Sequence, residues 1–283
     1  MEWSDGAMAP LDSCLGCLAC ETACPSGVRY GEILERARER SLLVAPPRHS
    51  WFRGKFLDAL THPAALRLQL ALARVVPGGK MPMLLARLFS DDPPVAQLPR
   101  ARARRLESHG PGLEKTALLG GCVMDVVFPH VHEATERLLA RVSLAAERTR
   151  GCCGALHAHG GYLNEGHRRA ERILAQAQGR RLVTNAAGCG SWLRKLAPPG
   201  SVVDATEILA ERGLEEPLRG SKGLPGLTAT YHDACHLAHG QGVRTAPRSL
   251  LAAVPGLLTV DLPESDTCCG SAGIYNLLQP KLA

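Results

Sequence analysis

The sequence predicts an α/β protein in which two cysteine-bearing lobes follow a small helical module. Short apolar runs that end in glycine turns alternate with amphipathic helical stretches over residues 116–190. A cysteine followed by a Cys-Cys-Gly triplet also occurs twice, with 29 residues between Cys122 and Cys152 and 32 between Cys235 and Cys268. We therefore expect two Rossmann-like lobes, related by a pseudo-two-fold axis, that present cysteines to a shared cleft.

The composition excludes several classes of protein. A chain of 283 residues with 45% hydrophobic content is long enough for two or three domains. Its net charge of +6 is mild and only 4% of its residues are aromatic, so we expect no nucleic-acid binding. No secretory signal is visible, and eleven cysteines in a cytoplasmic chain favour metal binding over disulfides. The apolar stretch 63–76 is too short to span a bilayer.

The first motif is a run of four closely spaced cysteines. Cys14, Cys17, Cys20 and Cys24, followed by Pro25, have the spacing C-x2-C-x2-C-x3-C-P. In bacterial ferredoxins this run holds a 4Fe-4S cluster through its thiolates. A zinc knot or a disulfide cluster is the alternative, but zinc sites usually use two separated cysteine pairs.

Helical segments follow the cysteine run. An amphipathic helix is predicted after Val28, with Ile33, Leu34 and Ala37 on its buried side. Pro46-Pro47 ends it, and residues 46–112 show helical patterns broken by prolines. The basic residues of this connector are interpreted as a solvated surface rather than a lipid-binding or partner-binding surface. They include Arg100, Arg102, Arg104 and Arg105.

In the first lobe the cysteines are expected in turns at the ends of strands. Strands are predicted at 116–119 and 181–185, and helices at 131–142 and 165–178. Open α/β sheets bind ligands at such strand ends. The turns carry Cys122, Cys152, Cys153 and Cys189.

These four thiols favour a metal cluster as the ligand of the first lobe. Adjacent cysteines form a strained disulfide, whereas two neighbouring thiolates can each bind a different iron atom. The alternative is that they are buried reduced cysteines that pack as small hydrophobic residues. For the histidines near the cysteines, hydrogen bonding is favoured over iron ligation or proton transfer. They are His157, His159, His232, His236 and His239.

The second lobe repeats part of the first. Strands are predicted at 227–231 and 257–260, and the candidate ligands are Cys235, Cys268 and Cys269. Only 14 residues follow Cys269, whereas 35 separate Cys153 from Cys189 in the first lobe. We therefore expect the second lobe to be incomplete.

Several motifs together resemble the cysteine-rich (CCG) domain family and, within it, the glycolate oxidase iron-sulfur subunits. The residues that carry the likeness are Cys14 to Pro25, Gly121-Cys122, Cys152-Cys153-Gly154, Asn185 to Gly190, Tyr231 to Leu237, Pro263 to Asp266, Cys268 to Gly273 and Tyr275 to Pro280. The resemblance implies an electron-transfer subunit, not catalytic alone, that accepts electrons from flavin-binding subunits oxidising glycolate. It further implies a quinone-type acceptor and at most peripheral contact with the cytoplasmic face of the inner membrane.

The resemblance also implies a domain organisation. Residues 1–45 would be a partial helical ferredoxin-type module, 46–112 a helical connector, 113–222 the first cysteine-rich domain and 223–283 the second, incomplete one. Family members have two ferredoxin motifs, and this chain has one, so Cys24 would point toward a second cluster. Trp192 stands where some relatives have a further cysteine. A fragment cut at both ends, or else one part of a split gene, is therefore expected.

Three alternatives remain open for the function. The chain resembles iron-sulfur subunits of lactate utilisation and of heterodisulfide reductase, in which such cysteines hold clusters. A non-catalytic remnant that binds a partner subunit without a competent cluster is the third. The choice of glycolate over lactate rests on resemblance alone.

Overall fold

The structure is a computed structural model that describes residues 10–44, 50–75, 113–271, 273–275, 279 and 281–282. The predicted connector falls partly outside these ranges, including its four arginines between 100 and 105. Parts of the last two resemblance motifs also fall outside them. These parts are residues 272, 276–278 and 280.

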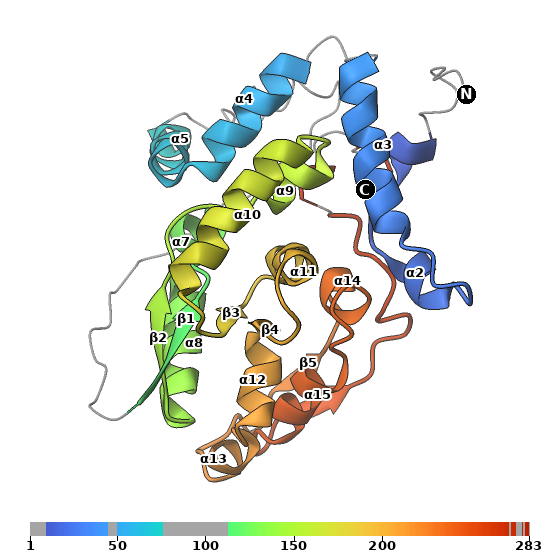
Figure 1. Cartoon of the computed structure of the whole chain (residues 1–283). Helices are drawn as coiled ribbons and strands as arrows, with labels where there is room; N and C mark the ends of the chain where they lie inside the picture. The colour runs from blue at the N-terminus through green and yellow to red at the C-terminus, as the bar shows by residue number, and fades with distance from the viewer. Residues whose placement is uncertain are drawn as a thin grey trace.

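The described elements fall into three groups along the chain (Figure 1). The first consists of helices only: α2 (Ala19–Ala23), α3 (Tyr30–Val44), α4 (Ser50–Thr61) and α5 (Pro63–Val75). The second alternates strands and helices: β1 (Glu114–Leu118), α7 (Val123–Val127), α8 (Pro129–Arg141), β2 (Leu144–Arg148), α9 (Ala155–His159), α10 (Leu163–Ala177), β3 (Leu182–Thr184), α11 (Ala187–Leu196), β4 (Val202–Asp204), α12 (Ala205–Glu211) and α13 (Glu215–Arg219). The third contains β5 (Thr228–Thr230), α14 (Cys235–Ala238), α15 (Thr245–Ala252) and β6 (Leu258–Val260).

The first lobe is built on a parallel four-stranded sheet in the order β2-β1-β3-β4. Thr116 pairs with Ala146 of β2, and Ala117 pairs with Leu182 of β3. Successive side chains of a strand point to opposite faces of the sheet, so neighbouring apolar residues enter different layers. Ala117 packs in the cluster of α9, α10 and α11, and Leu118 packs in the cluster of α8 and α12. Helices therefore cover both faces, and the predicted α/β class is confirmed.

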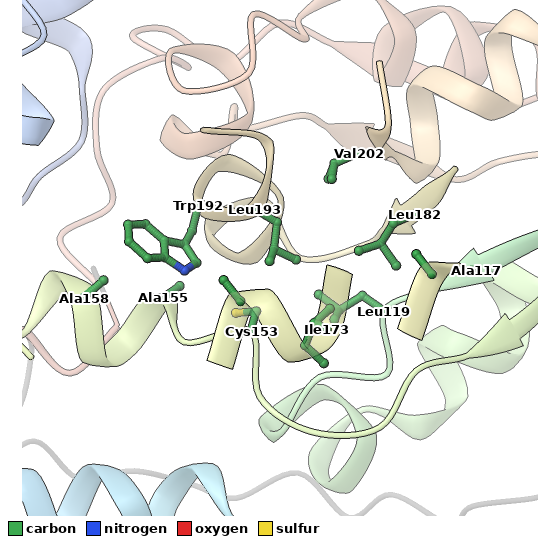
Figure 2. Packing of buried hydrophobic residues seen from close by; sticks show 12 residues of the cluster. Ala117, Leu119, Cys153, Ala155, Ala158, Ile173, Leu182, Trp192, Leu193 and Val202 are labelled. Carbon is green, nitrogen blue, oxygen red and sulfur yellow. The ribbon is translucent and has the colours of Figure 1, made fainter. Parts of the chain in front are cut away.

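Figure 2 shows the core cluster that Ala117 joins, which lies on the α9, α10 and α11 side of the sheet. In this cluster Leu193 of α11 lies toward Ile173 of α10 and the sheet residue Leu182, whereas the ring of Trp192 lies beside Ala155 and Ala158 of α9. Cys153 belongs to the same cluster and is only 2% exposed. The hydrophobic core of the lobe thus reaches one of the candidate ligands.

The second unit contains a parallel pair of strands, β5 and β6, in which Thr228 pairs with Leu258. It joins the first lobe through helices, since α11 packs against α14 and α12 packs against α15. Both of its strands were predicted. The pseudo-two-fold relation between the lobes and the ferredoxin-like character of the N-terminal part stay predictions.

Three details differ from the sequence-based expectations. Strands β2 and β4 were not predicted, because β2 ends in the charged pair Glu147-Arg148 and β4 has only three residues. Ile33 is 51% exposed, since the buried face of α3 is formed by Gly31, Leu34, Glu35 and Ala37. Cys189 lies in the first turn of α11 rather than in a loop, which is a correction.

A buried carboxylate attaches α3 to the first lobe. Glu35 is 8% exposed and accepts a hydrogen bond from Lys195 Nζ at 2.7 Å, while its other oxygen lies 3.5 Å from His159 Nδ1. Burial would raise the pKa of Glu35, but the hydrogen bonds from His159 and Lys195 and their charges outweigh it and lower this pKa. The nearby Arg38 donates hydrogen bonds to the carbonyls of His159 and Cys14 at 3.0 and 2.7 Å.

The C-terminal part of the chain holds the cysteine loop from the other side. His236 Nε2 donates to the Gly16 carbonyl at 2.9 Å, and His239 Nδ1 lies 3.0 Å from Thr22 Oγ1. The Tyr275 hydroxyl donates to the Ser13 carbonyl at 2.6 Å. The loop between Cys14 and Cys24 is therefore attached to the second unit, while α3 is attached to the first.

Gly154 is expected to be irreplaceable in the first lobe. Its φ is +89°, and an added Cβ would collide with the carbonyl oxygen of Gly166 on α10. We expect Gly154→Ala to lower the free energy of unfolding by about 3 kcal/mol, because backbone strain and the collision add. Gly179→Ala is the control, since its φ is +75° with open space around the added atom, and we expect about 1 kcal/mol there. Urea unfolding measures both, and equal losses would contradict the collision.

Neutralising Glu35 is expected to destabilise the protein in a pH-dependent manner. The lowered pKa means that the ionised carboxylate stabilises the fold above its ordinary pKa of 4.5, and that this contribution is lost as the pH falls through the folded value. We expect Glu35→Gln to cost about 1–3 kcal/mol at pH 7 and progressively less below pH 4.5. Glu32→Gln breaks only an exposed pair with Arg29 and should cost under about 1 kcal/mol. A loss for Glu35→Gln that does not change with pH would contradict the ionised pair.

Candidate metal centre

The cysteines of the first lobe gather at one edge of the sheet. Parallel strands end on the same side, so the segments that follow β1, β2 and β3 meet there. Cys122 follows β1 as the residue before α7, Cys152 and Cys153 follow β2, and Cys189 opens α11 after β3. The structure brings together all four thiols that the spacing singled out.

The thiols of Cys122 and Cys152 form a hydrogen-bonded pair. Their Sγ atoms are 3.6 Å apart, and the Gly154 N–H donates to Cys152 Sγ at 3.4 Å. Hydrogen bonds from Cys122 and Cys153, together with one from His157, lower the pKa of Cys152 against the effect of burial. The bond to Cys152 and then burial raise the pKa of Cys122. A negative charge on this pair is therefore favoured on Cys152.

Cys153 joins this pair to Cys189. Its thiol hydrogen-bonds with Cys152 and Cys189, and these bonds, followed by burial, raise its pKa well above the ordinary value. Cys152 and Cys189 line a cavity, and Cys153 lines it as well while packing against the core of the lobe. The Cys-Cys dipeptide therefore couples the site directly to the hydrophobic core.

A buried histidine fixes the turn that carries Cys122. His132 is fully buried, and its Nε2 donates to the Gly120 carbonyl at 2.7 Å. Its Nδ1 accepts a hydrogen bond from Asn185 Nδ2 at 3.1 Å, which requires the neutral ring. Burial lowers the pKa of His132 and thus favours that form.

Three of the four N-terminal cysteines lie close enough to interact electrostatically. The Gly16 N–H donates to Cys14 Sγ at 3.4 Å. Burial and then the charges of Cys17 and Cys14 raise the pKa of Cys20. Cys24 has a different environment, because backbone N–H groups of residues 26–28 lower its pKa. Cys14, Cys17 and Cys20 thus form one group, and Cys24 faces its own backbone turn.

Cys235 of the second unit interacts with Cys268 of the same unit and with Cys17 of the N-terminal loop. Burial, followed by the charge of Cys268 and a hydrogen bond with it, raises the pKa of Cys235 to about 12, and the charge of Cys17 adds to this effect. Cys269 is exposed and lines the same cavity as Cys235.

A cavity of about 1360 Å³ is lined by cysteines of the first lobe and of the second unit. Its walls come from the N-terminal helices, from both lobes and from the C-terminal part of the chain. Single small-molecule pockets usually enclose about 300–1,000 Å³, so this space exceeds one ordinary ligand. The cavity-lining cysteines are Cys122, Cys152, Cys153, Cys189, Cys235 and Cys269.

The donor chemistry fits an iron-sulfur group. All eleven cysteines are free thiols, and soft thiolate ligands select iron-sulfur clusters, zinc or copper. Within the described ranges no three histidine, cysteine or acidic side chains are arranged to hold a single metal ion. The thiolates of a cluster bind different iron atoms, so this group does not require them to meet at one point.

Several residues around the site could not be predicted from the sequence. Glu35, Arg38 and Lys195 form contacts between distant segments, and no motif marks them. Trp192, predicted to occupy the place of a further cysteine, lies in the core at 2% exposure.

No helix within the described ranges combines the length and apolar character that crossing a bilayer requires.

Comparison with known proteins identifies the family. The family model described as "Cysteine-rich domain" matches residues 116–194 and 229–283. The probable glycolate oxidase iron-sulfur subunit of Bacillus subtilis is 29% identical, over 99% of this chain and 73% of that protein. The glycolate oxidase iron-sulfur subunit of Escherichia coli is 30% identical, over 96% of this chain and 70% of that protein.

More distant matches extend the comparison. Lactate utilization protein A of Oceanobacillus iheyensis is 28% identical, over 60% of this chain and 75% of that protein. No solved structure matches significantly. The near full-length likeness and the two cysteine-rich matches show that this chain belongs to the glycolate oxidase iron-sulfur subunit family.

Proposed function

We propose that the chain is the iron-sulfur electron-transfer subunit of a flavin-dependent 2-hydroxy acid dehydrogenase, with glycolate as the substrate of the whole complex. The observation that carries the proposal is the convergence of thiols from three strand ends on one large cavity, in a chain of this family. The oxidation of substrate is assigned to flavin-binding partner subunits, so the chain is not catalytic alone. A quinone-type molecule is the proposed final acceptor.

We assign the thiols to two kinds of site. Cys14, Cys17 and Cys20 would hold a 4Fe-4S cluster, with Cys24 as its fourth ligand or as a ligand of a neighbouring one. Further iron and sulfur would be held by Cys122, Cys152, Cys153 and Cys189 in the first lobe and by Cys235, Cys268 and Cys269 in the second. An iron-sulfur cluster takes up and releases one electron at a time, which suits it to connect a flavin with another acceptor.

The surrounding residues support this assignment through charge and solvent exclusion. Backbone N–H groups of Gly16 and Gly154 donate to sulfur atoms, and such bonds stabilise negative charge on thiolates. The partly buried Arg38 lies beside Cys14, donates to its carbonyl and supplies positive charge there. The burial of Cys122, Cys152 and Cys153 keeps water away from the first-lobe thiols.

The organisation of the chain follows from the same proposal. The ferredoxin-type module would comprise residues 1–45, the connector 46–112 and the two pseudo-symmetric cysteine-rich domains 113–222 and 223–283. The cytoplasmic location and the peripheral contact with the membrane also stay predictions. A role in lactate utilisation is the second candidate, favoured by the likeness to lactate utilization protein A.

The first test is the loading of the chain with iron. Anaerobic purification and reconstitution should give a coloured protein with iron and acid-labile sulfide in equal amounts and a low-temperature EPR signal. Cys152→Ser should reduce iron per chain and leave the N-terminal signal intact, because the two thiol groups lie on different elements. Ser191→Ala, at another residue lining the cavity, is the control. A protein that stays colourless, or that binds only zinc by elemental analysis, would contradict the proposal.

The second test asks which of the N-terminal cysteines are ligands of the same cluster. Cys20 acts on Cys14 and Cys17, whereas Cys24 contacts its own backbone turn. We expect Cys20→Ser to abolish the N-terminal EPR signal and Cys24→Ser to preserve a weaker or shifted one. Equal loss in both variants would make Cys24 an ordinary ligand of the same cluster. Glycolate-dependent dye reduction that requires this chain would exclude the remnant alternative.

A further inference from the structure

A buried carboxylate lies directly before the first cysteine of the second unit. Asp233 is 2% exposed and lies in the loop after β5, two residues before Cys235. Its Oδ1 accepts a hydrogen bond from Arg248 Nη1 at 2.8 Å, and its Oδ2 accepts one from Arg248 Nη2 at 2.7 Å. A bidentate pair of this kind fixes the orientation of both side chains. Asp233 therefore has a defined position although it belongs to a loop.

Arg248 is held in place by its own surroundings in α15. Its Nη1 also donates to the carbonyl of Arg244, the residue directly before this helix, at 2.9 Å. Its guanidinium lies over the ring of Tyr231, 4.9 Å from the ring centroid, which adds a cation–π contact. Helix α15 packs against α12 of the first lobe. The ion pair thus connects the loop after β5 to a helix that contacts the first lobe.

Asp233 also contacts the second cysteine-bearing loop of this unit. Its backbone N–H donates to the Ser265 carbonyl at 2.8 Å. The Ser265 hydroxyl lies 3.4 Å from both Asp233 Oδ2 and Arg248 Nη2. Ser265 precedes Cys268 by three residues. The loop that carries Cys235 and the loop that carries Cys268 are therefore joined just before each of them reaches its cysteine.

The first lobe makes a contact at the same positions without a carboxylate. Gly120 and Thr149 precede the first-lobe cysteines by two and three residues, as Asp233 and Ser265 do in the second unit. A Cβ added to Gly120 would lie 2.5 Å from the Thr149 carbonyl oxygen, so the two backbones meet there directly. His132 then donates to the Gly120 carbonyl. In the second unit a carboxylate and an arginine stand in place of this glycine and histidine.

We propose that Asp233, held by Arg248, is a positioning residue that keeps the two cysteine-bearing loops of the second unit together. Their thiols, on Cys235, Cys268 and Cys269, can then bind one group. Cys235 and Cys269 already line the same cavity. The joining of the loops does not depend on the proposed function, whereas the binding of iron and sulfur by these thiols rests on it.

The first test measures how close the two loops are in the reduced, unloaded chain. Dibromobimane, a short reagent that bridges neighbouring thiols, should link Cys235 to Cys268 or Cys269, as peptide mapping by mass spectrometry would show. We expect Asp233→Asn and Arg248→Gln each to lower the yield of this link at least about threefold. The amide would turn its own NH2 toward a donor of Arg248, and the glutamine would leave a buried carboxylate unpaired. The double variant should lose no more than either single variant, since all three remove the same pair.

The matched control is Asp266→Asn. Asp266 lies in the same loop, but its side chain is exposed and its carboxylate is 3.9 Å from Arg244, so the yield should not change. Arg248→Lys keeps the charge without the bidentate geometry and should retain an intermediate yield. Circular dichroism checks that folded proteins are compared. A wild-type chain without the link, unchanged yields in both Asp233→Asn and Arg248→Gln, or an equal loss in Asp266→Asn would overturn the proposal.

A second measurement relates the position of the loops to the binding of iron. After reconstitution, Cys235→Ser defines the second-unit contribution to iron per chain and to the EPR signal. We expect Asp233→Asn to lose at least about half of that contribution and Asp266→Asn to lose none of it. Wild-type iron and EPR signal in Asp233→Asn would overturn this consequence. A wild-type chain that takes up no iron would contradict the proposed function, while the yields of the thiol link would still decide the role of Asp233.

Discussion

Strand β1 has hydrogen-bonded neighbours on both sides, and the arrangement of the first-lobe thiols depends on that position. Because β2 and β3 run parallel to it, the three segments that follow these strands leave the sheet at a common edge. His132 adds a second constraint by bonding to the Gly120 carbonyl directly before Cys122. Any change in the register of β1 would move all of these segments relative to one another.

The N-terminal helices complete this arrangement by paired charges as well as by apolar packing. Glu35 and Arg38 lie one turn apart on α3, and they contact Lys195 and the His159 carbonyl in the first lobe. Buried charges are tolerated only when they are paired, so these contacts specify one orientation of α3. The histidine contact with Gly16 from the second unit fixes the loop that α3 follows. The relative position of the thiol groups is therefore built into the fold.

The sequence allowed the parallel α/β class, the main helices and the grouping of the first-lobe cysteines to be predicted, because spacing and periodicity carry that information. Strand β4 escaped prediction because three residues hold no periodic signal, and Cys189 was placed in a turn because flanking glycines mark turns more often than helix starts. The contact between Asp58 and His157 spans 99 positions of the chain. No local pattern encodes such a contact, so the surroundings of the thiols required the structure.

The thiols differ strongly in their exposure to solvent, and we expect the exposed thiols to be oxidised before the buried ones. Cys20 and Cys269 are exposed, whereas Cys153 is 2% exposed within the core (Figure 2). Oxidation of cysteine to sulfenic and then sulfinic acid follows access and thiolate character. By access, peroxide should therefore reach Cys20 and Cys269 before the buried thiols of the first lobe. Oxidative inactivation of this chain would then begin at its periphery, with the folded first lobe outlasting the damage.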